Sequence, residues 1–161
     1  MGWIIAFDAN CMNIAMFTNN YRPNPYGVTV SVERFAASLR ERGHRVYIFA
    51  PRWRGRTDDD EKDVYRYPSI DISYRFRFPL SIGYSWKMRK VLDALDIDVV
   101  HAHHPTLLGA AARRFARRKH VPIVFTWHTR YDMYGNFVPR MFRAAATAWM
   151  IRAGVRFADS C

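Results

Sequence analysis

The feature that most constrains the fold is a regular alternation of short apolar runs with longer stretches of helical periodicity. An apolar run at residues 14–18 leads into a polar loop, after which apolar side chains recur every third or fourth position over residues 28–39. Gly43 follows, where a glycine commonly ends a helix, and residues 46–50 form a second apolar run. A strand, a helix and a strand in this order predict a βαβ unit with parallel strands.

The same alternation continues toward the C-terminus, with short apolar segments typical of buried strands between stripes of helical spacing. A loosely alternating segment at 64–78 favours edge strands. Further strands are expected at residues 98–101 and 121–126, and further helices at 88–95, 107–118 and 139–154. We therefore predict an α/β fold with a doubly wound parallel sheet, Rossmann-like in architecture.

Length and composition indicate one ordinary globular domain. The chain has 161 residues, of which 50% are hydrophobic and 24% charged, which excludes a disordered chain. Its two cysteines, Cys11 and Cys161, show no ligand or disulfide spacing, as is usual in a reducing compartment. No segment approaches the roughly 20 apolar residues of a membrane span. We expect a cytoplasmic domain over residues 12–161, preceded by an N-terminal extension at 1–11 without a patterned element.

The positive charge is concentrated in the second part of the chain. The net charge is +11, and from His101 onward there are 10 basic and 2 acidic residues, a difference of +8. Such a field attracts nucleic acid, anionic membranes or phosphorylated substrates. Four arginines fall on one broad face of an expected helix. This face is either a membrane-docking surface or an ordinary solvated surface. They are Arg113, Arg114, Arg117 and Arg118.

Three polar clusters follow expected strands, at residues 19–27, 101–105 and 128–135. In sheets of this class ligands bind beyond the carboxyl ends of the strands, so the clusters are expected to share one crevice. Gly27, between Tyr26 and Val28, opens a helix whose unpaired N–H groups suit an anion. A plain turn glycine is the alternative interpretation.

The histidines of the second cluster are His101, His103 and His104. A His-x-His pair at a strand end occurs in metal-dependent hydrolases, but a zinc site needs three or four convergent ligands and no carboxylate accompanies these. We expect no metal site here, and a mixture of crevice-lining and structural histidines instead.

The third cluster is the densest in polar and aromatic side chains. His128 follows a buried strand, where a histidine can donate a hydrogen bond to a sugar hydroxyl or a phosphate oxygen. Tyr131 and Tyr134 offer flat faces and hydroxyls to a carbohydrate ring. A structural histidine that caps the next helix is the alternative.

Several motifs together resemble the amino-terminal domain of family 4 glycosyltransferases. The resemblance covers about residues 12–159. Within the family, the chain resembles bacterial diacylglycerol glucosyltransferases and phosphatidylinositol mannosyltransferase-like members. The motifs are residues 13–23, Gly27-Val28, 39–46, 98–105 with Leu108-Gly109, and 125–131 with Tyr134 and Pro139.

The resemblance implies one half of a GT-B enzyme, in which two Rossmann-like domains face across a cleft and transfer retains anomeric configuration without a metal or other cofactor. It assigns His128 the catalytic contact with the transferred sugar. Tyr26 stands where the family commonly has a second glycine. The acceptor and sugar contacts are expected at Tyr26, Gly27, Val28, His103, His104, Arg130, Tyr131 and Tyr134.

The family's donor-binding residues, a basic pair and a Glu-x7-Glu segment, belong to a second domain that these 161 residues do not include. The resemblance thus predicts the acceptor-binding half of a retaining glycosyltransferase that moves a sugar from a nucleotide sugar to a lipid or glycan acceptor. This half is expected to be inactive alone. We expect it on the inner face of the cell membrane. The alternative is a basic α/β module that binds anionic surfaces or nucleic acid without catalysis. Because no nucleic-acid-binding signature is present, we favour the first and expect no nucleic-acid partner.

Overall fold

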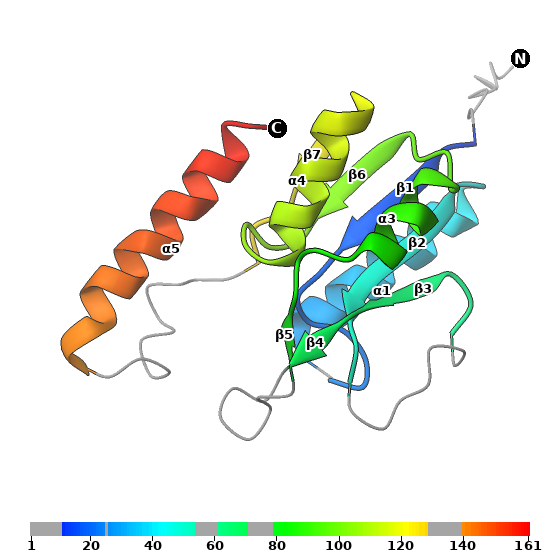
Figure 1. The fold of residues 1–161 in the computed structure, drawn as a ribbon. Helices are drawn as coiled ribbons and strands as arrows, with labels where there is room; N and C mark the ends of the chain where they lie inside the picture. Colours follow the sequence, from blue (N-terminus) through cyan, green and yellow to red (C-terminus); the bar gives the residue numbers. More distant parts are fainter. Residues whose placement is uncertain (1–10, 25, 54–60, 71–78, 129–139) are drawn as a thin grey trace, which may run out of the picture.

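A parallel β-sheet forms the centre of the molecule. The computed structural model describes residues 11–24, 26–53, 61–70, 79–128 and 140–161. Within these ranges the sheet has five strands in the order β3-β2-β1-β6-β7, all parallel (Figure 1). The strands are β1 (Asn13–Phe17), β2 (Arg45–Pro51), β3 (Val64–Tyr67), β6 (Val99–Ala102) and β7 (Ile123–Phe125). The predicted Rossmann-like α/β class is confirmed.

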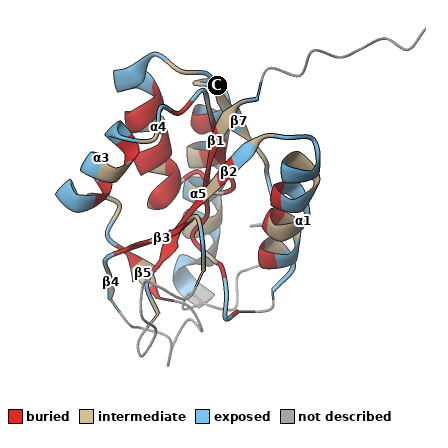
Figure 2. Ribbon diagram, turned by 90° about the vertical axis from the view of Figure 1, so that its right-hand side faces the viewer, coloured by how far each residue is buried: buried red, intermediate tan, exposed pale blue. Residues whose placement is uncertain are grey.

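Helices cover both faces of this sheet. Helix α1 packs on one face, whereas α3 and α4 pack on the other, so that the strands lie between two layers of helix (Figure 2). A short antiparallel pair, β4 (Ser69–Ile70) and β5 (Leu80–Ser81), lies beyond β3. The helices are α1 (Gly27–Glu41), α3 (Trp86–Asp93), α4 (Leu108–Lys119) and α5 (Arg143–Ala158), with a 3₁₀ turn at Arg140–Phe142.

The two cores follow from the alternation of side chains along each strand. In β1, Ile14 and Met16 point toward α1, while Ala15 and Phe17 point toward α4, and all four are buried. A strand buried on both faces has to be apolar throughout, which is why this run carries no alternating polar residues. Burial of each large side chain contributes about 1.5–3 kcal/mol, so the central strand anchors the whole sheet.

Most element boundaries match the sequence prediction. Gly43 adopts φ +89°, the left-handed conformation expected of a residue just past a helix end. Ser85 caps α3 by accepting a hydrogen bond from the Met88 N–H at 3.3 Å. Residues 71–78 of the expected edge-strand segment and residues 1–10 of the expected extension lie outside the described residues.

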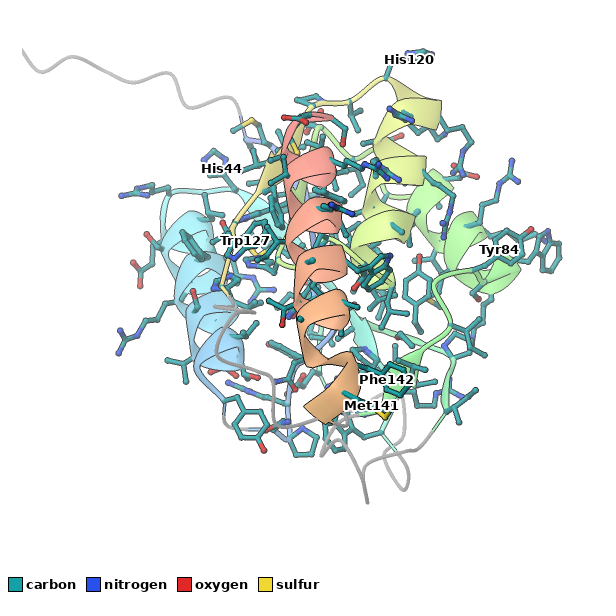
Figure 3. All side chains as sticks on the ribbon, turned by 90° about the vertical axis from the view of Figure 1, so that its left-hand side faces the viewer. His44, Tyr84, His120, Trp127, Met141 and Phe142 are labelled. Carbon is teal, nitrogen blue, oxygen red and sulfur yellow. The ribbon has the colours of Figure 1, made fainter. Side chains whose placement is uncertain are left out.

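The last helix differs from its prediction, because α5 continues past Gly154 to Ala158. Gly154 does not end the helix. It is buried, and a Cβ there would overlap the indole ring of Trp127, so this glycine serves close packing rather than termination. Figure 3 places Trp127 between α1 and α5. Phe157 is 1% exposed and packs on Phe125 with ring centroids 4.8 Å apart, which fixes the C-terminal end of α5 against the sheet edge.

Candidate functional site

Backbone hydrogen bonds continue beyond the carboxyl ends of the strands and hold the loops in register. The N–H of His103 donates to the Phe17 carbonyl at 2.9 Å, and the N–H of Thr126 donates to the Ala102 carbonyl at 3.0 Å. The segments after β1, β6 and β7 are thereby brought together at one edge of the sheet, as predicted for a shared crevice.

Asn19, in the loop after β1, ties the first two segments together. Its backbone N–H donates to Nδ1 of His104 at 3.1 Å. Its side-chain Nδ2 donates to the Thr106 carbonyl, and its Oδ1 accepts from the Leu108 N–H at 3.0 Å. The residue at the start of α4, Leu107, provides no side-chain cap, so Asn19 caps this helix from a distant loop. No local pattern in the sequence indicates this role of Asn19, because its partners are more than 80 positions away.

The histidines of the second and third clusters meet directly. Nδ1 of His103 and Nε2 of His128 share a hydrogen bond of 2.7 Å, and the two rings stack with centroids 5.0 Å apart. Nε2 of His101 shares a second 2.7 Å hydrogen bond with Oγ1 of Thr126. The rings of His101 and His103 lie 4.1 Å apart, and Phe35 of α1 packs on both.

Burial determines the charge of this cluster. It lowers the pKa of His101 to about 4, that of His104 to about 3 and that of His103 to about 2, with smaller contributions from neighbouring histidines. The pKa of His128 is also lowered by burial. At neutral pH these imidazoles are therefore uncharged, and each supplies one hydrogen-bond donor and one acceptor.

The start of α1 borders an open groove. Tyr26 precedes the helix without a side-chain cap, and a Cβ added at Gly27 would meet no atom of the described residues within 4 Å, so none of these residues fills the space beside this glycine. Tyr26 is exposed and Val28 is half-buried. The groove has a volume of about 430 Å³ and continues along α1 to Phe35, which contacts the histidine cluster. It is lined by Gly27, Val30, Ser31, Arg34, Phe35 and Ser38.

The remaining predicted site residues lie in two places. Arg130, Tyr131 and Tyr134 fall outside the described residues. His103 is 1% exposed and so lies beneath the surface, and His104 is half-buried with its Nδ1 bonded to Asn19.

The four arginines of α4 are partly engaged within the domain. Arg114 donates to the Gly83 carbonyl, and Arg118 pairs with Asp93 of α3 at 2.8 Å. The Arg113 guanidinium lies 5.8 Å from the centroid of the Phe157 ring. Arg117 is exposed. These contacts hold α4 against its neighbours, so the basic face has a structural role in addition to any docking role.

Two further findings concern the described part of the chain. No three His, Cys, Asp or Glu side chains gather there in a way that could hold a metal ion. None of its helices is long and apolar enough to cross a bilayer.

Fold and site together define a Rossmann-like domain with a packed histidine cluster at the carboxyl ends of its strands. The chain belongs to glycosyltransferase family 4, whose model matches residues 25–161. The resemblance predicted from the sequence motifs is thereby confirmed.

Curated relatives carry two kinds of name. The alpha-monoglucosyldiacylglycerol synthases of Streptococcus pneumoniae and Acholeplasma laidlawii are 24% and 32% identical to this chain, over 92% and 81% of it. The GDP-mannose-dependent alpha-mannosyltransferase of Mycolicibacterium smegmatis is 36% identical over 86% of the chain. The matches cover 34%, 33% and 38% of these relatives, so the chain spans about a third of their length.

Proposed function

We propose that this chain is the acceptor-binding half of a retaining glycosyltransferase that moves a sugar from a nucleotide sugar to a lipid or other membrane-proximal acceptor. The observation that carries the proposal is the position of His128. It lies just after β7, in hydrogen-bond contact with His103 of the segment after β6, whose ring packs against Phe35 of α1. The names of the relatives support the substrate classes, since they include a glucosyldiacylglycerol and GDP-mannose.

In this proposal His128 acts as a fixed neutral dipole. Transfer breaks the bond between the anomeric carbon and the diphosphate oxygen, the acceptor hydroxyl oxygen bonds to that carbon, and the hydroxyl proton departs with the phosphate. An imidazole that is neutral and held in place can donate a hydrogen bond to the sugar without first reorganising. We further propose that no metal cofactor takes part and that hydrogen-bond donors stabilise the charge that develops on the leaving diphosphate.

Donor binding is expected to come from a second domain. The relatives are about three times as long as the stretch that matches this chain. Binding energy for the nucleotide sugar has to come from groups that contact it, and the acceptor half provides only part of them. We therefore expect no sugar transfer by the 161 residues alone.

The test joins this chain to the donor domain of the Acholeplasma laidlawii relative and measures transfer of labelled glucose to diacylglycerol in vesicles. His128→Ala should lower kcat/KM by about 100-fold, the typical effect of removing one preorganised donor, while the far-ultraviolet circular dichroism stays unchanged. His120→Asn is the matched control, since His120 is exposed at the far end of α4. Similar small effects of both changes would contradict the role of His128.

The basic half of the chain favours a second candidate, a basic α/β module that binds anionic surfaces or nucleic acid without catalysis. If α4 docks on the membrane, as proposed for its arginines, Arg117→Gln should weaken co-sedimentation with anionic vesicles, since an exposed basic residue contributes about 1 kcal/mol there. Replacement of all four arginines by glutamine should weaken it further. Retention on duplex DNA in place of vesicles would favour the second candidate.

A further inference from the structure

We propose that His103 is a positioning residue that occupies Nε2 of His128 and fixes its tautomer, so that His128 offers its Nδ1–H to the ligand. This inference rests on the proposed role of His128. Within the described ranges, the 2.7 Å bond between His103 and His128 is the only hydrogen bond between two histidine side chains. Because Nε2 of His128 is engaged, Nδ1 is the nitrogen that remains for a ligand.

The location of His103 makes this contact rigid. Its backbone is held to β1 by the 2.9 Å bond to the Phe17 carbonyl. Its ring is packed between that of His101, 4.1 Å away, and that of His128. His101 in turn is tied to Thr126, two residues before His128, by a 2.7 Å bond. Both ends of the His103–His128 bond are thus fixed by separate contacts, as preorganisation requires.

One proton lies between the two nitrogens, so one imidazole donates and the other accepts. Both are neutral at pH 7, because burial lowers both pKa values. If His128 donated from Nε2, the proton of His103 would sit on its own Nε2. That atom is buried and has no hydrogen-bond partner among the described residues. A buried N–H without an acceptor is rarer in proteins than an unsatisfied acceptor, and leaving a buried polar group unpaired costs about 1–3 kcal/mol.

The favoured arrangement therefore places the proton of His103 on Nδ1, which donates to Nε2 of His128. The proton of His128 then resides on Nδ1, which makes this nitrogen a hydrogen-bond donor. An apolar ring at position 103 would fill the same space and leave no unpaired nitrogen in the core. A histidine at position 103 therefore lowers the free energy of unfolding relative to an apolar ring. What it contributes instead is the orientation of His128.

The first experiment needs only the 161-residue chain, and it does not depend on sugar transfer. Long-range ¹H–¹⁵N correlation spectra of histidine-labelled protein at pH 7.5 report which nitrogen of each imidazole is protonated. We expect the Nδ1–H form for His128 in the wild type and a mixture of tautomers in His103→Phe. His103→Asn, whose amide can donate from nearly the position of Nδ1, should restore the wild-type tautomer.

The second experiment uses the two-domain enzyme described above. His103→Phe should lower kcat by about tenfold or more with little change in KM, as expected for a wrong tautomer at a reacting site, and His103→Asn should recover most of it. His120→Asn again serves as the control. A wild-type His128 protonated on Nε2, or an unchanged tautomer in His103→Phe, would overturn the proposal. If His103→Phe does not fold, the wild-type spectrum and His103→Asn still decide it. Absence of transfer by the wild-type enzyme would instead count against the proposed function.

Discussion

Acid should destabilise the domain through its buried histidines, and His101 is the best position for the test. Its side chain is 7% exposed, and burial lowers its pKa from the ordinary 6.5 to about 4. Between these two values the unfolded chain binds a proton that the folded chain does not. The free energy of unfolding is therefore fully retained above about pH 6.5 and falls as the pH is lowered toward 4.

The expected loss is large compared with the stability of a domain. At pH 5 the unfolded imidazole is almost fully protonated and the folded one is neutral, so linkage gives a loss of about 2 kcal/mol from His101 alone. Burial lowers the pKa values of His103 and His104 as well, so their contributions have the same sign. Because domains are typically stable by only about 5–15 kcal/mol, unfolding should become easy near pH 5.

The variant His101→Gln removes the titrating group and keeps an amide that can bond to Thr126. Urea unfolding at pH 7.5 should find it less stable than the wild type by no more than about 1 kcal/mol, the cost that would follow if the amide lost the bond to Thr126 altogether. At pH 5 the difference should shift by about 2 kcal/mol in favour of the variant. His120→Asn, at a position with φ 54° that asparagine tolerates, should follow the wild type. A difference between His101→Gln and the wild type that does not change with pH would show that protonation of His101 does not drive the loss of stability in acid.

Two packing predictions complete the set, both measured by urea and thermal unfolding. A Cβ at Gly109 would overlap the His104 carbonyl oxygen, so Gly109→Ala should cost more than about 3 kcal/mol, whereas Gly27→Ala, with open space around it, should change stability by less than about 0.5 kcal/mol. Asn19→Ala removes two side-chain hydrogen bonds at the start of α4 and should cost about 2 kcal/mol; equal stability of this variant and the wild type would show that solvent replaces both bonds.

The strands and helices could be predicted because their signals are local. Apolar runs and helical spacing identified β1, α1 and β2, and the position of Gly43 marked a helix end. The extent of α5 could not be read in the same way. In sequence, Gly154 resembles a helix terminator. In the structure, a Cβ at this position would overlap the ring of Trp127, which only the tertiary fold brings next to it.

The sequence predicted which segments form the site, but not the hydrogen bonds and ion pairs that join them. The first cluster is bonded to the second through Asn19 and His104, and the second is bonded to His128 through His103, whereas residues 129–135 of the third cluster lie outside the described residues. The capping of α4 by Asn19 and the use of Arg118 to hold Asp93 both depend on which elements become neighbours in space. Spacing along the chain contains no such information, so a helix face that reads as a free basic surface is partly committed to internal contacts.

The histidine pair shows how strand register creates chemistry that no single motif contains. In the pairing of β6 with β7, His101 lies opposite Val124 and Ala102 lies opposite Phe125. Paired residues of β6 and β7 are 23 positions apart, whereas the bonds from His101 to Thr126 and from His103 to His128 both span 25 positions. Each bond therefore reaches the residue two positions beyond the paired one, on the same face of the sheet. A slip of β7 by one residue would turn Thr126 and His128 to the opposite face together. Phe125 resists that slip because it packs into the core beside Phe157, while Val124 remains exposed. The apolar packing of an edge strand thus determines which nitrogen of His128 is available to a ligand.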